Sequence, residues 1–281
     1  MEMPVFEGNS ITIGANSSAT AKFAAAESTR CVLITAPEGM KIYGGSGYVP
    51  NAQTHSSEAT NCGNGVYALT IPASSESFYL SFVNESANIK TANIEITENS
   101  LAVFGTSISE LPNNGQVTFS VYGSGFSDKS VVTVVGDGVK LPVAGIKYVS
   151  PNELSVTLAP EYAQAGEYEL AVNDGISGAA CGKNLTVLQT SKGPVLETET
   201  VLPNGARAGR TFAFTVKCRN AGDANLAIPM VTLRDTGDAG LEFSLDGENF
   251  KAGEIKFLSL DNNGGFDAIE AGKDIALANK E

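Results

Sequence analysis

The sequence predicts an all-β protein made of three tandem β-sandwich modules. Between residues 116 and 175, apolar and polar residues alternate in short segments bounded by Gly, Pro, Asn or Asp. Alternation of this kind between turn residues is typical of half-buried antiparallel strands. Similar signals recur on both sides, and no long window carries the apolar period of about 3.6 residues that a helix needs. The 30 glycines, the 11 prolines and the absence of tryptophan suit β-cores of Val, Ile, Leu and Phe.

The first predicted module, residues 1–98, combines strand-like segments with one long polar loop. Strands are expected at residues 10–14, 20–26, 30–36, 40–44, 66–72, 77–83 and 89–97. The loop, residues 44–64, is rich in Gly, Ser, Asn and Thr. A loop of this length inside a compact domain is usually functional, disordered or cross-linked.

The second and third modules, residues 99–189 and 194–281, are joined by the short linker TSKGP. Turns in the second module are expected where Gly, Asn and Asp accept positive φ, at residues 112–115, 136–138, 150–152 and 173–175. Strands in the third module are expected at residues 208–222, 226–235, 240–250 and 274–278, with a hairpin turn at Asp246 and Gly247. Short linkers limit hinge motion, so we expect an extended, semi-rigid rod.

The central module contains the segments VTFSVYGSGFSDKSVVTV, then SPNELSVTLAP, then AGEYELAVNDG. In this order they resemble an IPT/TIG domain, which has an immunoglobulin-like fold. In that family a Gly-x-Gly-Phe turn follows the strand that enters the core, and a Gly-x-Tyr-x-(apolar)-x-Val strand comes near the end. The matching residues here are Gly123, Gly125, Phe126, Gly166, Tyr168, Leu170 and Val172.

The flanking modules resemble two other families of β-sandwich. The first is similar to the bacterial pre-peptidase C-terminal sandwich, and Asn84 closes its Tyr-x-x-(apolar)-Asn strand one residue later than the family pattern. The third is similar to CARDB-type adhesion sandwiches, whose Asn-x-Gly-(Asp/Asn) signature is present at residues 220–223. It ends before the family's last strands, which predicts a truncated sandwich. All three families occur mainly in large secreted or surface-attached bacterial proteins, so the resemblances imply an extracellular or cell-surface location.

The charge balance argues against two classes of partner. Eighteen basic and 31 acidic residues give a net charge of −13. Nucleic acids and anionic membranes bind clustered Lys and Arg, so neither is an expected partner. No apolar run reaches the length of about 18 residues that spans a bilayer, so no membrane insertion is expected in this segment. The start lacks a secretory signal, which fits a piece of a longer polypeptide. The protein or glycan surface partner is not identified by the sequence.

No catalytic constellation is predicted, so we do not expect an enzyme. The single histidine, His55, lies in the polar loop, and a Ser-His-Asp or Cys-His site would have to use it as its base. Ser56, Ser57 and Glu58 are neighbours in sequence, which does not make a triad, and the favoured interpretation is a solvated loop histidine. One histidine also excludes the two-His zinc patterns.

No cofactor or metal is expected, and calcium is the alternative that stays open. Six acids fall in turns of the third module: Asp235, Asp238, Asp246, Glu248, Asp261 and Asp267. The segment DNNGG at residues 261–265 resembles a calcium loop. The Gly and Glu positions of an EF-hand, however, hold Phe266 and Gly272. We therefore favour solvated turn acids.

The four cysteines suggest one possible cross-link. Cys31 on a predicted strand and Cys62 at the end of the loop belong to one module. In an oxidising compartment a disulfide between them would pin the loop, and closing about 30 residues stabilises by roughly 3–4 kcal/mol. In the alternative state these thiols are reduced. Cys181 and Cys218 are expected to be buried free thiols.

Tyr43 and Tyr48 are the candidate binding residues. They flank a Gly-rich turn at the mouth of the loop, where a ring could stack on a sugar or on another protein. The alternative is that both rings pack into the core or the turn.

Three functional hypotheses follow. The favoured one is a non-catalytic structural or adhesion segment of a large bacterial extracellular or cell-surface protein, because adhesion-type modules occur without a catalytic constellation. The second is a ligand- or glycan-recognition module that uses the 44–64 loop. The third is an accessory region of a secreted hydrolase, since modules of the pre-peptidase and TIG types often flank catalytic domains.

Overall fold

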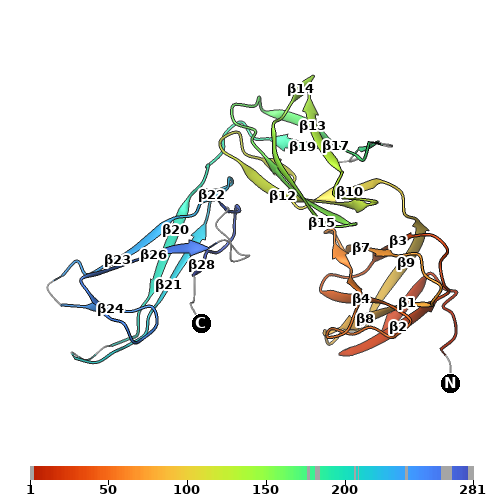
Figure 1. Ribbon diagram of the computed structural model, residues 1–281, viewed down its shortest axis with the longest axis horizontal. Coiled ribbons are helices and arrows are strands. Elements are labelled where there is room, and N and C mark those ends of the chain that lie inside the picture. Colours follow the sequence, from red (N-terminus) through yellow and green to blue (C-terminus); the bar gives the residue numbers. More distant parts are fainter. Residues whose placement is uncertain are drawn as a thin grey trace. The chain divides into compact units, whose positions relative to one another are not determined.

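Every regular element that the computed structural model describes is a β-strand, as predicted (Figure 1). The structure describes residues 3–175, 178–180, 184–205, 207, 209–237, 240–260 and 268–277. Within these residues, no helix has the length and apolar character needed to cross a membrane. The strands pair into sheets in three successive parts of the chain, and the larger sheets form sandwich-like pairs.

Two sheets form the first sandwich, with strand orders β1-β9-β3-β7-β6 and β2-β8-β4-β5. The strands are β1 (Ser10–Ile13), β2 (Ser17–Phe23), β3 (Arg30–Thr35), β4 (Met40–Ser46), β5 (Ser57–Glu58), β6 (Thr60–Asn61), β7 (Val66–Ile71), β8 (Phe78–Asn84) and β9 (Lys90–Glu98). Every strand expected in this part is present. The short strands β5 and β6 lie inside the predicted loop, where the polar sequence carries no alternation.

The core of the first sandwich comes from the apolar positions of its long strands. Val32 and Ile34 on β3, and Leu80 and Phe82 on β8, are completely buried. Each such side chain stabilises the fold by roughly 1.5–3 kcal/mol relative to an exposed one. These side chains form the centre of the first core.

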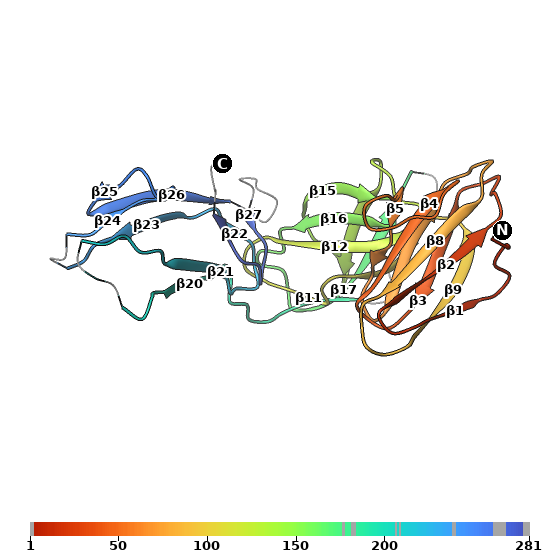
Figure 2. The same cartoon turned by 90° about the horizontal axis from the view of Figure 1, so that it is seen from below.

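The central sandwich pairs the sheet β10-β12-β16-β15 with the sheet β11-β19-β17-β13-β14, and β18 pairs with β17. Figure 2 shows β12, β16 and β15 side by side. The strands are β10 (Ala102–Thr106), β11 (Glu110–Leu111), β12 (Val117–Ser124), β13 (Val131–Gly136), β14 (Val139–Lys140), β15 (Val143–Ser150), β16 (Glu153–Leu158), β17 (Gly166–Asn173), β18 (Gly178–Ala180) and β19 (Leu185–Val187).

Glycine is required at two places in the central sandwich. Asp137 and Gly138 connect β13 to β14 with φ of 48° and 77°, a pair of positive φ values typical of a two-residue hairpin turn. A Cβ atom on Gly123 would collide with the Ala102 carbonyl oxygen and with the ring of Phe126. Gly123 therefore makes room for Phe126, which is 4% exposed.

The C-terminal part contains smaller sheets, with orders β20-β21, β22-β27, β23-β26-β28 and β24-β25. The strands are β20 (Leu196–Val201), β21 (Thr215–Asn220), β22 (Leu226–Ala227), β23 (Met230–Arg234), β24 (Glu242–Phe243), β25 (Lys251–Ala252), β26 (Glu254–Leu260), β27 (Ala268–Ile269) and β28 (Ala276–Leu277). The expected turn at Asp246 and Gly247 lies between β24 and β25, and Gly247 has a φ of 76°.

The strands of the C-terminal part are shorter than the sequence predicts. The expected strand 208–222 is reduced to β21, and Pro229, which has no N–H to donate, separates β22 from β23 in the expected strand 226–235. The described core is small, with Cys218, Ile269 and Ile275 buried. Several apolar side chains of these strands are exposed, among them Val201, Met230 and Leu258, which accounts for the small core.

Strands β8 and β21 both end at an asparagine whose side-chain amide bonds to the main chain. The Nδ2 atom of Asn84 donates to the carbonyl oxygens of Gly14, at 2.8 Å, and Asn88, at 2.7 Å. The Nδ2 atom of Asn220 donates to the carbonyl oxygens of Ala224, at 2.8 Å, and Ile269, at 3.0 Å. In each case the amide oxygen accepts from the main-chain N–H two residues further on. We call this arrangement the amide latch.

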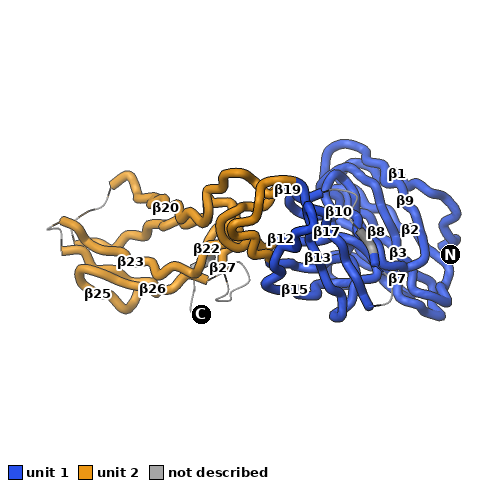
Figure 3. Tube along the Cα trace, turned by 90° about the horizontal axis from the view of Figure 1, so that it is seen from above, with its two compact units in different colours: residues 1–109, 119–157, 167–186 blue, residues 110–118, 158–166, 187–281 orange. Residues whose placement is uncertain are grey.

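The chain divides into two compact units (Figure 3). One comprises residues 1–109, 119–157 and 167–186, and the other comprises residues 110–118, 158–166 and 187–281. The first unit contains the first sandwich and most of the central one. The boundaries of the three predicted modules, 1–98, 99–189 and 194–281, stay a prediction.

Candidate functional site

The candidate tyrosines occupy different environments. Tyr43 on β4 is 5% exposed, and its ring centroid lies 5.0 Å from that of His55. A ring so covered offers no open face for stacking on a ligand. Tyr48 is 37% exposed, and its hydroxyl lies 3.1 Å from Ser56 Oγ. Of the two, only Tyr48 has a surface that a partner could touch.

The 44–64 loop is held by its own hydrogen bonds. Asn51 Oδ1 accepts from the main-chain N–H groups of Gln53 and Thr54, both at 2.9 Å. The main-chain N–H of Ser56 donates to the carbonyl oxygen of Gly44 at 2.8 Å. A cross-link is therefore not needed to order this loop.

Close packing also fixes Tyr48 over β4. A Cβ atom on Gly45 would lie 2.9 Å from the Tyr48 carbonyl oxygen and 3.1 Å from Tyr48 Cε2. Gly44 and Gly45 of β4, which carry no side chains, thus let the loop fold back onto the strand. Tyr48, His55 and Ser56 together form a small aromatic and polar surface, which we call the Tyr48 ledge.

His55 is tied to the loop itself. Its Nδ1 atom lies 3.0 Å from the carbonyl oxygen of Asn51. Within the described part of the chain, this imidazole bonds to a main-chain oxygen and not to a carboxylate that could orient it as a base. The sequence favoured a solvated loop histidine, whereas His55 is half-buried with its ring against Tyr43.

The structure does not bring Cys31 and Cys62 within bonding reach. Cys31 lies on β3, and Cys62 directly follows β6, with β7 between these strands in the sheet. Two strand spacings amount to roughly 9.5 Å, whereas a disulfide needs Cα atoms within about 7 Å. Both residues are free thiols, so the predicted bridge would require the sheet to rearrange.

Burial keeps these thiols protonated. It raises the pKa of Cys31 above its ordinary value, although a hydrogen bond with Ser124 acts in the opposite direction. Burial raises the pKa of Cys62 to about 12. Burial also raises the pKa of Cys218, which is a free, buried thiol as predicted. Cys181 lies outside the described residues.

Two of the candidate calcium acids cap turns. Main-chain N–H groups of Leu241 and Gly237 lower the pKa of Asp235. The main-chain and side-chain N–H groups of Asn249 hold the pKa of Asp246 far below its usual range, with further bonds from Ser244 and Glu248. Their oxygens are thus engaged by the protein.

Of the other four candidate acids, only one belongs to the residues that the structure describes. Asp238, Asp261 and Asp267 lie outside the described residues. Glu248 is described, and its main-chain N–H donates to Asp246. No cluster of three His, Cys, Asp or Glu side chains suited to a metal ion occurs in the described residues.

Two asparagines that no sequence motif singled out bond to residues distant in the chain. Within the first compact unit, Thr70 Oγ1 on β7 donates to Asn152 Oδ1 at 2.9 Å, and Asn152 Nδ2 donates to the carbonyl oxygen of Gly123 at 2.9 Å. Within the second unit, Asn225 Nδ2 donates to Thr118 Oγ1 on β12 at 2.7 Å, and Thr118 N donates to Asn225 Oδ1 at 3.1 Å. The sequence marks Asn152 only as a turn residue.

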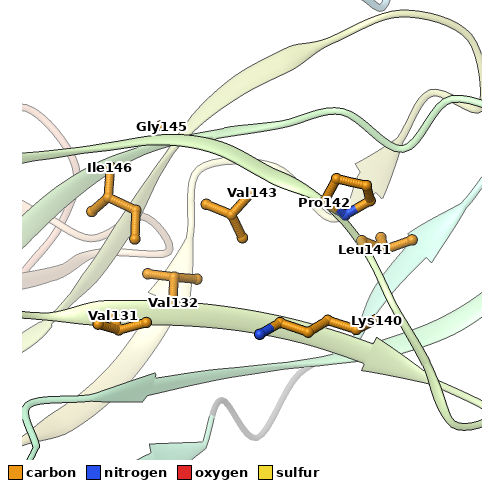
Figure 4. Close-up of a pocket in the computed structure, with 8 residues that line it drawn as sticks. All are labelled: Val131, Val132, Lys140, Leu141, Pro142, Val143, Gly145 and Ile146. Atoms are coloured by element: carbon orange, nitrogen blue, oxygen red, sulfur yellow. The ribbon is translucent and has the colours of Figure 1, made fainter.

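An apolar cleft on the central sandwich was also not expected from the sequence. The cleft has a volume of about 500 Å³ and lies between β13 and β15 (Figure 4). It is lined by Val131, Val132, Lys140, Leu141, Pro142, Val143, Gly145 and Ile146. No strand was expected at residues 143–150, so this surface could not be predicted from the sequence.

Comparison with known proteins leaves the family open. No family model matches the chain, and no curated protein matches it. The crystal structure of the I9–I11 tandem from titin is similar to this chain, with 13% sequence identity, 93% coverage of each chain and a TM-score of 0.23. The match is to a tandem of β-sandwiches. It assigns no family.

Proposed function

We propose that this chain is a non-catalytic structural or adhesion segment of a large bacterial extracellular or cell-surface protein. In this proposal it consists of three tandem β-sandwiches, and the central one is of the IPT/TIG type. The motif glycines support the IPT/TIG assignment of the central sandwich, because Gly123 leaves space for the buried ring of Phe126 in the Gly-x-Gly-Phe turn.

The observation that carries the proposal is the pair of asparagine junctions. Asn152 binds the first sandwich through Thr70, and Asn225 binds the central sandwich through Thr118. Such bonds tie a sandwich to its neighbour directly and do not leave the linker as the only connection. A segment that holds other parts of a protein at a defined distance needs junctions of this kind.

The location can be tested on cells. Antibodies raised against residues 1–281 should label intact cells of the source bacterium or its culture medium, and protease added outside the cells should remove the signal. Labelling that appears only after lysis would contradict the proposal. A cytoplasmic marker labelled in parallel controls for leakage.

The alternative function is ligand or glycan recognition by the Tyr48 ledge. The partial exposure of Tyr48 and its hydrogen bond to Ser56 favour it, although Tyr43 cannot contribute an open ring. A glycan array separates the two functions. Specific binding that Tyr48→Ala abolishes and Tyr162→Ala leaves intact would favour recognition, because Tyr162 is 95% exposed and lies in the central sandwich.

The third hypothesis, an accessory region of a secreted hydrolase, concerns the parent polypeptide. Determining the sequence that adjoins this segment in the parent gene tests it directly. A catalytic domain encoded beside the segment would support it.

A further inference from the structure

The linker TSKGP, residues 190–194, is bonded at its start to a single side chain. The Nδ2 atom of Asn113 donates to the carbonyl oxygen of Gln189 at 2.7 Å. The hydroxyl of Ser191 donates to Asn113 Oδ1 at 2.8 Å. Asn113 and the linker belong to the same compact unit. The first half of the linker is therefore held from the side and does not rely on its own short length for order.

The carboxylate of Asp223 holds the second half of the linker. Its Oδ2 atom accepts from the main-chain N–H of Lys192, and its Oδ1 atom accepts from that of Gly193, both at 2.8 Å. The main-chain N–H of Asp223 donates in return to the carbonyl oxygen of Gly193 at 3.2 Å. Hydrogen bonds to a charged acceptor are roughly twice as strong as those between neutral groups. One side chain thus fixes two successive peptide groups.

Asn220 and Gly222 extend this contact to the end of the linker. The main-chain N–H of Val195 donates to Asn220 Oδ1 at 3.3 Å, and the main-chain N–H of Ala221 donates to the carbonyl oxygen of Val195 at 2.8 Å. A Cβ atom on Gly222 would collide with the carbonyl oxygen of Gly193. Glycine at this position therefore lets the two segments approach closely enough for these bonds.

The segment 220–225 is itself anchored, so the linker is not bonded to a loose loop. Asn220 is completely buried, and its Nδ2 atom donates to the carbonyl oxygen of Ile269 at 3.0 Å. The main-chain N–H of Asn225 donates to the carbonyl oxygen of Gln116 at 2.7 Å. All of these residues lie in one compact unit. A change of direction at the linker would have to break several of these bonds together.

We propose that residues 190–195 form a locked joint and that the Asp223 carboxylate is its lock. The residues from 192 to 195 donate every main-chain N–H they have to a side-chain oxygen, because Pro194 has none. Without the carboxylate, water takes over two of these donors and the linker becomes a hinge. This goes beyond the proposed function, because it assigns two states to the joint and holds wherever the protein is located.

Pulsed electron–electron resonance between two spin labels tests the lock. The labels are attached to ketone-bearing amino acids in place of Tyr162 and Met230, which are 95% and 63% exposed and lie on either side of the linker in the sequence. This chemistry leaves the cysteines unmodified. We expect one narrow distribution of distances in the protein with its native linker contacts. In Asp223→Ala the distribution should broaden, because the linker then samples many directions.

Asp246→Ala is the matched control. Asp246 also accepts from two main-chain N–H groups, those of Glu248 and Asn249, but these belong to its own turn and not to the linker. Its loss removes the same kind of bond from the same part of the chain. The distance distribution should therefore stay narrow.

Hydrogen exchange separates release of the joint from unfolding of the C-terminal part. In Asp223→Ala the amides of Lys192 and Gly193 should exchange about tenfold or more faster, the change expected for the loss of one hydrogen bond to a charged group. The amides of β26, the central strand of the sheet β23-β26-β28, should keep their rates.

Each of three results would overturn the proposal. An unchanged, narrow distribution in Asp223→Ala would show that the carboxylate does not hold the joint. A broad distribution before any substitution of Asp223 would show that the joint is not locked. Equal acceleration of exchange in the linker and in β26 would assign the effect to unfolding. None of these results bears on the cellular location of the protein, so they are distinct from a failure of the proposed function.

Discussion

The hydroxyl oxygen of Thr70 lies 2.9 Å from Asn152 Oδ1, and this hydrogen bond joins the first sandwich to the central one. Asn152 is 4% exposed, and its other amide atom donates to the Gly123 carbonyl oxygen. One side chain thus serves both a junction between sandwiches and the interior of the second. Such double use makes the residue a sensitive point for mutation.

Asn152→Ala should destabilise the central sandwich by about 1–3 kcal/mol, because it leaves the Thr70 hydroxyl and the Gly123 carbonyl without their partner. Thr70→Val removes only the junction bond and should cost about 0.5–1.5 kcal/mol. Native-state hydrogen exchange of the amides in β12 and β7 measures both. Equal effects of the two variants would show that the bond to Gly123 contributes nothing.

Gly123→Ala should destabilise strongly, by about 2 kcal/mol or more, since the new methyl group must displace the Phe126 ring or the chain at Ala102. Gly105→Ala is the matched control, because a Cβ atom there meets nothing within 4 Å, and its effect should stay within about 0.5 kcal/mol. Thermal unfolding followed by circular dichroism compares the two. Similar midpoints would contradict the assigned role of Gly123.

The three described thiols should react slowly in the native protein. Burial raises the pKa of Cys62 to about 12, so almost no thiolate is present at neutral pH. Iodoacetamide at pH 7.5 should therefore spare Cys31, Cys62 and Cys218 until the protein is unfolded. Without reductant, unfolded protein should then be labelled at all three. A Cys31 and Cys62 pair that stays unlabelled in denaturant would instead establish the disulfide.

Acid should loosen the turn that contains Asp246. The pKa of this carboxyl is held below its ordinary value of 3.8 by hydrogen bonds from Asn249, Ser244 and Glu248. A pKa lowered by folding stabilises the structure above the ordinary value, and the contribution is lost as the pH falls through the folded-state pKa. Amide shifts of residues 244–249 should therefore change well below pH 3.8. In Asp246→Asn this acid transition should disappear, and its persistence would assign it to another group.

The fold was predictable where local alternation and the burial of side chains agree. On β16, Leu154, Val156 and Leu158 are buried and alternate with half-buried neighbours, so this strand and its buried face follow from the sequence. In β15, Ile146, Tyr148 and Val149 are exposed in spite of being apolar. Its sequence mixes Gly and Lys with apolar residues on both faces, and no alternation distinguishes it from a loop.

The candidate site was less predictable, because its geometry depends on contacts distant in sequence. Whether Tyr43 is buried depends on the pairing of β4 with β5 and β8, which no local pattern encodes. The separation of Cys31 and Cys62 likewise depends on β7 lying between their strands. The bond between Thr118 and Asn225 joins residues 107 positions apart. Local sequence indicates that Asn225 is polar but not which strand it meets.

The amide latch gives two segments of unrelated sequence the same local course. Asn84 and Asn220 each bind a carbonyl four residues ahead and an N–H two residues ahead. The five residues NESAN at 84–88 and NAGDA at 220–224 are therefore two versions of one connector. The inner residues adapt each connector to its own surroundings, since Ser86 bonds back to Asn84, whereas Asp223 accepts from the main-chain N–H groups of Lys192 and Gly193.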